Sequence, residues 1–490
     1  MKPQRNEACP CGSGKKFKLC CGRGSPLSRA RPASVDGPSA VETNQLIAMI
    51  KSNRFAEAEI AARGMVDRFP TVGFGWKCLS VARVMQDKNA LDALRTAAAL
   101  LPNDAEAHFN LGYALRKWGR PNEALGSYYK GLNLNRDNAE ALTVVGELLV
   151  EQGHYSEARQ SFQRAAEINP DLAAVWVGLA NCWVFDRDIA WLDNAQRLLQ
   201  GSLQLQEAID LRFAIGRYHD HHGNFEQAFA SFKAANELTQ SHGLVFDPTQ
   251  ITAQVDQIIN TFDEAWIVSQ SAVGNDSNLP VFLVGMPVSG TTLAGQLLAV
   301  HPRVIDAGAL NYWLGRSAEN SAQLAPDYLQ WLARLASGAD RVIDRMAANY
   351  MMIGMIHAAL PNAHIIHIDR DPMDTCLGIY SNNFAATYAY SADLEDLAHQ
   401  YQEYLRLMRH WRSVLPAGVL LDLSYASLVQ DPQSASRAMV EFIGLSSEGQ
   451  PATIDRDQTG EAIAIRSLGA SRNYERFLGP LRNLESLQAR

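Results

Sequence analysis

The pattern of apolar and polar positions divides the chain into a helical region and a mixed region that begins near residue 278. Between residues 39 and 242, small and apolar residues recur with a period close to 34 residues. Beyond residue 278, short apolar runs alternate with segments of helical periodicity. This strand-helix order predicts a parallel sheet that binds its ligand at the carboxyl ends of the strands.

The recurring unit predicts two helices joined by a turn. Ala124 and Ala158 are small residues that let the second helix of a unit approach the first, and Gly119 and Gly153 suit the turn between them. These features are typical of tetratricopeptide repeats, and six such units bury a continuous core. The solenoid predicts a groove for a protein or peptide partner. A spacer or an oligomerisation surface is the alternative, because a repeat fold does not define a ligand.

One loop of the mixed region predicts an anion site. An apolar strand at residues 281–284 leads into a loop of small residues that contains Ser289 and Gly290, and Thr291 and Thr292 open the next helix. This layout points backbone N–H groups and the positive end of a helix dipole at an anion. No Lys follows Gly290, so the loop is not a Walker A sequence. The alternative is an ordinary turn that binds nothing.

The loop, written VGMPVSGTTL, resembles the 5′-phosphosulfate loop of sulfotransferases that use 3′-phosphoadenosine 5′-phosphosulfate (PAPS), in the form found in tetratricopeptide-linked and tyrosylprotein-like members. The segment HIIHIDRDPMDTCLGIYSNNF resembles the one that grips the 3′-phosphate, with Arg370 at the phosphate-binding Arg. The segments HPRVIDAGAL, RVIDRMAANY, SYASLVQDP and SRNYERFLGPL also resemble this family. The resemblance implies an α/β P-loop-like sulfotransferase domain over residues 278–490, with PAPS held by residues 289–292 and Arg370.

Several positions depart from the family pattern. Val288 replaces an Arg of the loop, Gly378 replaces the Ser that contacts the 3′-phosphate, and Ala309 replaces the acid that activates the acceptor. Arg345, Ala347 and Ala426 stand where the family has Lys, Pro and Glu, and the segment before Asn473 is shortened. Sulfuryl transfer, by analogy with phosphoryl transfer, depends on positioned cations, so these changes bear on catalysis.

Two functions therefore stay open. In the first, the domain transfers a sulfuryl group from PAPS to a hydroxyl acceptor on a protein or peptide that the repeats recruit. Asp306 or Asp344 then supplies the missing base, and Arg345 keeps the positive charge of the family Lys. In the second, the chain is a catalytically impaired relative that acts as a repeat-based scaffold. A kinase is disfavoured, because no acidic pair for Mg²⁺ is evident.

The first residues predict a small metal site. Cys9, Cys11, Cys20 and Cys21 lie within thirteen residues, and four thiolates complete a tetrahedral zinc centre. Neighbouring Lys residues favour the thiolate form. Disulfides or a disordered tail are the alternatives. The segment CPCGSGKKFKLCCG resembles the SEC-C zinc motif, which implies a structural or partner-docking zinc with no open position for water.

Composition and charge restrict the classes of partner and the cellular compartment that we expect. The chain is 47% hydrophobic and 20% charged, with a net charge of −8, while residues 1–31 carry eight Lys and Arg against Glu7 alone. A short basic tip on an acidic body predicts no nucleic-acid-binding surface. Neither a membrane-spanning run nor a secretory h-region is present, which predicts a cytoplasmic protein. The predicted domains are a zinc motif (1–24), a linker (25–38), repeats (39–242), a helical bridge (243–277) and the sulfotransferase-like domain (278–490).

Overall fold

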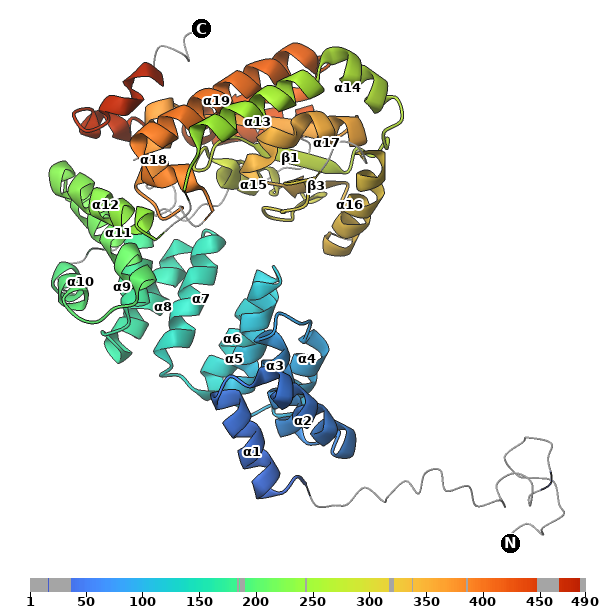
Figure 1. Cartoon of the computed structure of the whole chain (residues 1–490), viewed down its shortest axis with the longest axis vertical. Helices are drawn as coiled ribbons and strands as arrows, with labels where there is room; N and C mark the ends of the chain where they lie inside the picture. The colour runs from blue at the N-terminus through green and yellow to red at the C-terminus, as the bar shows by residue number, and fades with distance from the viewer. Residues whose placement is uncertain are drawn as a thin grey trace. The chain divides into compact units, whose positions relative to one another are not determined.

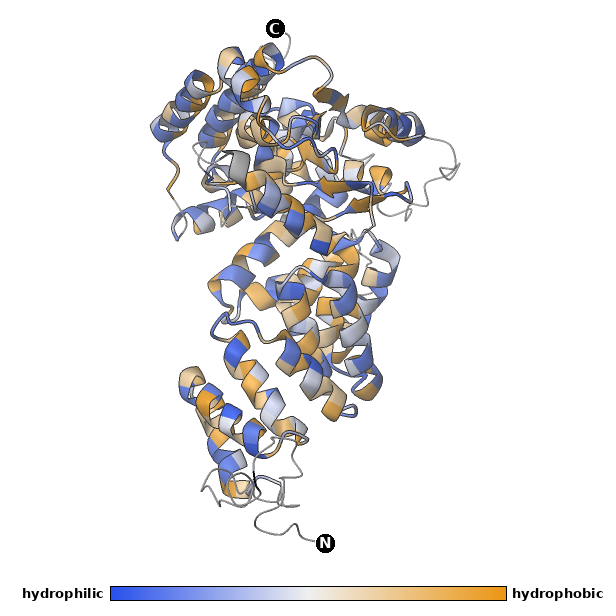
Figure 2. Cartoon of the chain, turned by 90° about the vertical axis from the view of Figure 1, so that its right-hand side faces the viewer, coloured by the Kyte–Doolittle hydropathy of each residue, from blue (hydrophilic) through white to orange (hydrophobic). Residues whose placement is uncertain are grey.

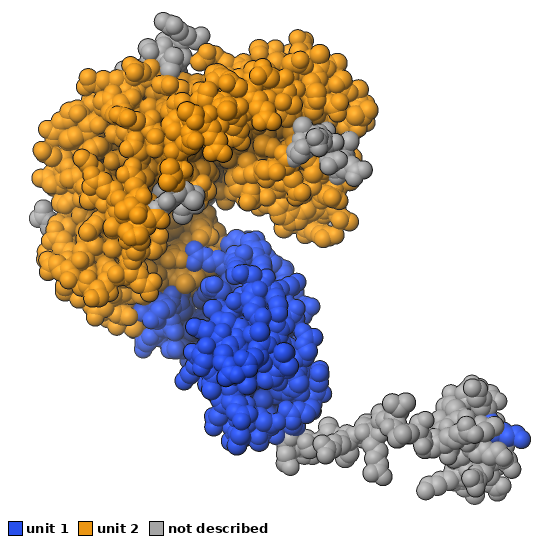
Figure 3. Space-filling view, in the orientation of Figure 1, with its two compact units in different colours: residues 1–141 blue, residues 142–490 orange. Residues whose placement is uncertain are grey.

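A computed structural model describes Lys16 and residues 37–182, 185, 190–242, 245–316, 321–336, 338–384, 387–446 and 467–484. The chain forms two compact units, residues 1–141 and residues 142–490, which Figure 3 shows in two colours. Each unit is described by itself below.

The first unit is a stack of antiparallel helix pairs. Its helices are α1 (Ala40–Lys51), α2 (Phe55–Arg68), α3 (Gly73–Val84), α4 (Leu91–Leu100), α5 (Ala105–Lys117) and α6 (Pro121–Leu134), and α7 (Ala139–Glu151) begins at its end. Capping residues set the helix starts: Ser39 and Glu42 form a capping box on α1, and the Asp104 carboxylate accepts two backbone N–H bonds at the start of α5. Gly119 makes the turn between α5 and α6 at φ +71°.

Close helix packing in this unit depends on glycine, and α6 offers a matched test. A Cβ on Gly131 would overlap the ring of Phe109, whereas a Cβ on Gly126 would meet nothing within 4 Å. We expect Gly131→Ala to lower the free energy of unfolding by about 1–3 kcal/mol through overpacking. Gly126→Ala should raise it by about 0.5–1 kcal/mol, because Ala favours the helix. Urea unfolding followed by circular dichroism compares the two; equal effects would contradict this packing.

The second unit continues the repeats and ends in a sheet domain (Figure 1). Its repeat helices after α7 are α8 (Tyr155–Ile168), α9 (Ala173–Asn181), α10 (Trp191–Leu199), α11 (Leu205–His221) and α12 (Phe225–Gln240). The sheet domain contains the strands β1 (Pro280–Val284), β2 (Val304–Asp306), β3 (Arg341–Asp344), β4 (His364–Asp369) and β5 (Leu420–Ser424). Its helices are α13 (Pro248–Thr261), α14 (Glu264–Ser271), α15 (Thr291–Leu298), α16 (Ser321–Leu335), α17 (Ile353–Ala359), α18 (Pro372–Tyr380), α19 (Leu394–Val414), α20 (Tyr425–Gln430) and α21 (Pro432–Phe442), with 3-10 turns at Ala347–Met352, Ala389–Ala392, Ala470–Tyr474 and Gly479–Leu484.

The five strands form one parallel sheet in the order β2-β3-β1-β4-β5. The inner strands β1 and β3 are buried on both faces, whereas the edge strands β2 and β5 are partly exposed. Figure 2 shows the sheet domain coloured by hydropathy. Val281 and Leu283 face α15, α20 and α21, while Phe282 and Val284 face the layer that contains α16, α17 and α19. β1 lies at the centre, where successive connections turn to opposite sides, which is the usual ligand position in such sheets.

The segment predicted to be a helical bridge packs on the sheet domain. Helix α13 lies against α19, and α14 lies against α17, as Figure 1 also shows. Val255, Phe262 and Ile267 from these helices enter the same core as the sheet. This burial attaches both helices to the domain that follows them.

The last repeat pair shares a core with the sheet domain. The Phe229 ring of α12 stacks on Phe477 with centroids 4.6 Å apart and on Tyr380 with centroids 5.6 Å apart. The buried Asn236 amide donates to the carbonyl oxygen of Tyr380 at 2.8 Å. Within the second unit, α11 and α12 are therefore held firmly against the sheet domain. The predicted fold class, a helical repeat solenoid followed by an α/β domain with a parallel sheet, is confirmed.

Candidate functional site

The loop after β1 has the geometry of an anion cradle. Gly290 has φ +110°, and a Cβ there would overlap the ring of Tyr425, so only glycine fits. Helix α15 begins at Thr291 without a side-chain cap, which leaves the polar end of the helix open to a ligand. The Ser289 hydroxyl is buried and finds no hydrogen-bond partner among the described residues. These features fit a bound phosphate or sulfate group.

Val288 stands out within this loop. It is a β-branched residue at φ +66°, a conformation that such side chains rarely adopt, so the loop stores strain here. A Cβ on Gly378 of α18 would lie 3.0 Å from Cγ1 of Val288. The two residues that replace the family Arg and Ser are therefore in contact, and the Val288 side chain occupies the space beside Gly378.

Arg370 follows β4 and ties two segments together. One terminal nitrogen of its guanidinium donates to the Val288 carbonyl oxygen at 2.7 Å, and the other donates to the Ser467 carbonyl oxygen at 2.9 Å. The guanidinium also lies 4.5 Å from the centroid of the Tyr425 ring. Its buried Nε has no partner among the described residues. Arg370 thus holds the anion loop, and its Nε–H and the second N–H of each terminal nitrogen remain for a ligand.

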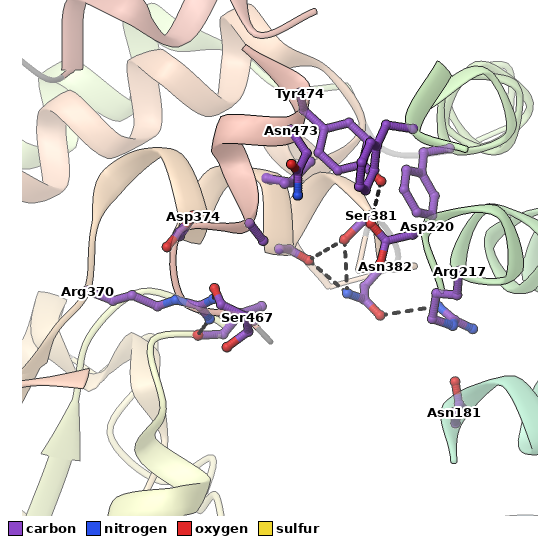
Figure 4. Close-up of a pocket in the computed structure, with 16 residues that line it drawn as sticks. Asn181, Arg217, Asp220, Arg370, Asp374, Ser381, Asn382, Ser467, Asn473 and Tyr474 are labelled. Carbon is purple, nitrogen blue, oxygen red and sulfur yellow. Dashed lines mark hydrogen bonds between the residues drawn. The ribbon is translucent and has the colours of Figure 1, made fainter. Parts of the chain in front are cut away.

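A cavity of about 350 Å³ opens beside Arg370. Figure 4 shows Arg370 and Ser467 on one side of it, with Arg217 and Asn181 from the repeat helices on the other. The lining also contains Val288, Gly378, Asp374, Ser381, Asn382, Asp220 and Tyr474. The cavity therefore joins the predicted donor site to the end of the repeat region.

The repeat residues of this lining were missed by the sequence analysis. The 34-residue period identifies the small positions that pack helices, but it does not say which polar side chain of an irregular copy faces the next domain. The sequence offers no signal that separates Arg217 and Asp220 from other charged residues of α11, such as Asp210 and Arg212.

A second polar cluster lies at the carboxyl ends of β2 and β3. The Asp306 carboxylate accepts a hydrogen bond from Nε of Arg345 at 3.1 Å and another from the backbone N–H of Gly308 at 2.8 Å. Arg345 also donates to the Thr292 hydroxyl at 3.2 Å. Three of the predicted site residues, Asp306, Arg345 and Thr292, are thus joined in one network beside the start of α15.

Asp344 is placed differently. It is fully buried and accepts hydrogen bonds from the Leu310 and Met346 backbone, the Tyr328 hydroxyl and the Asn349 amide. The carboxylate therefore joins β3 to three neighbouring segments. Such a position suits a structural role, so half-buried Asp306 is the better placed of the two candidate bases.

The burial of Asp344 has a consequence for pH dependence. Burial raises the pKa of this carboxyl from 3.8 to about 6, against the opposing effect of its four donors. Between about pH 4 and 6 the folded chain then holds a proton that the unfolded chain has lost, so this residue makes stability fall as the pH rises, by about 3 kcal/mol. Urea unfolding at pH 4, 5, 6 and 7 measures the free energy of unfolding of wild type and of Asp344→Asn. The value for wild type minus the value for Asp344→Asn should fall as the pH rises. A flat difference would contradict it.

The predicted zinc ligands, Cys9, Cys11, Cys20 and Cys21, lie outside the described residues. Within the described ranges there is no group of His, Cys, Asp and Glu arranged to hold a metal ion. Cys78, Cys182 and Cys376 are buried. No helix in the described part of the chain is long and apolar enough to cross a membrane.

Comparison with known families matches all three parts of the chain. Residues 315–449 match the model of the sulfotransferase family, and residues 5–23 match the SEC-C motif. Residues 93–126 and 139–172 match tetratricopeptide repeat models. These matches confirm the predicted combination of motifs. The sulfotransferase match begins after the loop at 285–292 and includes Arg345 and Arg370.

Individual relatives cover parts of the chain. An uncharacterized protein of Aquifex aeolicus is 26% identical over 404 residues, which are 75% of this chain and 51% of the relative. The protein translocase subunit SecA of a Nitratiruptor species is 72% identical over 25 residues, 5% of this chain and 3% of SecA. The solved structure of Pseudomonas aeruginosa pilF is 15% identical and covers 40% of this chain and 90% of its own, with a TM-score of 0.34. The chain spans about half the length of the Aquifex relative and far less of SecA.

Proposed function

We propose that this chain, which carries a sulfotransferase-family domain behind tetratricopeptide repeats, transfers a sulfuryl group from PAPS to a hydroxyl acceptor. The observation that carries the proposal is the anion cradle at the carboxyl end of the central strand. There, a glycine that no side chain can replace, an uncapped helix start and an unpartnered buried Ser hydroxyl meet. Arg370, tied to the same loop, supplies the positive charge.

In this proposal the donor lies across the carboxyl edge of the sheet. Residues 289–292 bind the 5′-phosphosulfate through backbone N–H groups and the Ser289 hydroxyl. Arg370 and the adjoining cavity receive the 3′-phosphate end. Backbone N–H groups make most of the contacts to the 5′-phosphosulfate, so this anion can bind although Val288 replaces the family Arg. The replacement does remove a positive charge that would stabilise the transition state.

The transfer itself needs a proton acceptor. The acceptor hydroxyl oxygen forms a bond to sulfur, the bond between sulfur and the bridging phosphate oxygen breaks, and 3′-phosphoadenosine 5′-phosphate (PAP) leaves. Asp306 takes the hydroxyl proton, because its carboxylate lies in the network that reaches Thr292 at the start of α15. Arg345 orients this carboxylate and adds positive charge near the leaving oxygen.

The proposal is tested by transfer of label from [³⁵S]PAPS to phenols and to Tyr- and Ser-containing peptides. We expect labelled product from the full chain above the rate in buffer. Absence of product together with intact PAP binding would favour the second function below, and absence of both would remove the donor site.

A second function has one observation in its favour. Val288 fills the space beside Gly378, so two positions that would contact the donor are closed by an apolar contact. This packing supports a catalytically impaired protein that retains the fold and acts as a scaffold through its repeats. Restoring both residues in Val288→Arg/Gly378→Ser distinguishes the two, because only an impaired enzyme should gain transfer.

The repeats and the N-terminal motif complete the proposal. A groove of the repeats recruits a protein or peptide acceptor, and the exposed Tyr113 and Tyr129 offer aromatic contacts for it. Cys9, Cys11, Cys20 and Cys21 hold a structural zinc in the segment that matches the SEC-C motif. Among the described residues, the buried free thiols Cys78 and Cys376 support a reducing, cytoplasmic setting.

A further inference from the structure

Arg217 is a half-buried cation that has few hydrogen-bond partners among the described residues. It lies on α11 and lines the same cavity as Arg370 (Figure 4). Its Nε is buried without a partner, and the described residues provide the guanidinium with one long hydrogen bond, 3.4 Å to Oδ1 of Asn382. Burial lowers the pKa of Arg217 to about 10, an effect that nearby Asp210 only partly opposes. A guanidinium that is partly removed from water and has few partners is stabilised by a bound anion.

The neighbouring carboxylates are engaged elsewhere. Asp210 accepts hydrogen bonds from the side-chain amides of Asn383, at 2.8 Å, and Gln206. Asp220 accepts the Tyr474 hydroxyl at 2.6 Å. Asp374 accepts the backbone N–H groups of residues 469 and 471 at 2.6 and 2.9 Å. Within the described structure these three carboxylates accept hydrogen bonds from groups other than Arg217.

The position of Arg217 is fixed before any ligand arrives. Helices α11 and α12 pack together, and α12 is held to the sheet domain by the Phe229–Phe477 stack and by the bond from Asn236 to Tyr380. The Arg217 side chain then reaches Asn382, just beyond the end of α18. A ligand bound between Arg370 and Arg217 would meet a preorganised pair of cations, which reduces the entropy lost on binding.

We propose that Arg217 is a nucleotide-binding residue that the repeat region contributes to the donor site, where it binds the 3′-phosphate together with Arg370. This inference rests on the proposed function. Gly378 offers no hydroxyl to this phosphate, and one N–H of each terminal nitrogen of Arg370 already binds a backbone carbonyl. Arg217 supplies further donors, with the forked geometry that phosphate favours. The repeats would then complete the enzyme site in addition to recruiting an acceptor.

The test is calorimetric titration of the full chain with two nucleotides, PAP and adenosine 5′-phosphosulfate, which lacks the 3′-phosphate. Wild type is compared with Arg217→Gln, Arg217→Lys and the control Arg212→Gln, on the same helix but outside the cavity. We expect Arg217→Gln to lower the affinity for PAP by about tenfold or more, and the affinity for adenosine 5′-phosphosulfate by less than about threefold. Arg217→Lys should fall between Gln and wild type, and Arg212→Gln should match wild type.

Each other outcome overturns the inference in a recognisable way. Equal weakening of both nucleotides by Arg217→Gln assigns Arg217 to the structure of the cavity, and an unchanged PAP affinity removes it from the site. If wild type binds both nucleotides equally, the donor site stands but the proposed contact to the 3′-phosphate is excluded. If wild type binds neither nucleotide, the proposed function is excluded as well. If circular dichroism shows that Arg217→Gln does not fold, the test rests on Arg217→Lys. This variant is still expected to lose part of the preference of wild type for PAP over adenosine 5′-phosphosulfate.

Discussion

Replacing Asp306 by Asn is expected to lower the rate of sulfuryl transfer by about two to four orders of magnitude, because the proposed general base is lost. Gly308 donates to Oδ1 of Asp306 and Arg345 donates to Oδ2, so the single amide oxygen of Asn keeps only one of these two hydrogen bonds. Circular dichroism therefore checks that the variant folds. Affinity for PAP should stay within about twofold, since the proposal places this residue at the acceptor hydroxyl and not at the nucleotide.

The measurement is transfer of label from [³⁵S]PAPS beside calorimetric titration with PAP. Asp340→Asn is the matched control, because Asp340 pairs with Arg303 away from the cluster. A full rate in Asp306→Asn would exclude this carboxylate as the base. A loss of PAP affinity of the same size as the loss of rate would assign the residue to the shape of the site instead of to proton transfer.

Arg370→Ala is expected to lower PAP affinity by about a hundredfold or more. The substitution removes a charge-assisted contact to phosphate, worth about 1.5–3 kcal/mol. It also removes the two bonds that tie the Val288 and Ser467 carbonyl oxygens together, so the anion loop loses its support. The two effects act in the same direction, and their sum gives the expected change.

Titration calorimetry measures this affinity, and Arg334→Ala on the exposed side of α16 serves as the control. Circular dichroism checks that the variant folds. An Arg370→Ala protein that is folded and binds PAP as wild type does would show that the cavity beside Arg370 is not the 3′-phosphate site.

Much of the fold could be predicted because burial leaves a clear pattern. A strand buried on both faces, such as β1, appears as an unbroken apolar run, and helix pairs that pack closely need small residues at a fixed period. The bounds of the anion loop follow from the same run and from Gly290. The packing of residues 243–277 on the sheet domain could not be predicted, because their apolar positions are compatible with any neighbouring core.

The candidate site was harder to predict for a physical reason. Asp306 and Asp344 both end a strand, so sequence alone does not separate an accessible acid from one enclosed by four donors. Val288 and Gly378 are ninety residues apart, and only the structure shows that they are in contact. Arg217 belongs to a repeat helix, and its place beside the donor cavity depends on how the last repeat packs on the sheet domain.

Titration of purified full-length protein with PAP tests the central claim most directly. A working donor site predicts saturable binding with one PAP per chain and a dissociation constant in the micromolar range. Absence of binding at millimolar PAP would contradict the donor site, and the sulfotransferase-like domain would then have to be treated as part of a repeat-based scaffold.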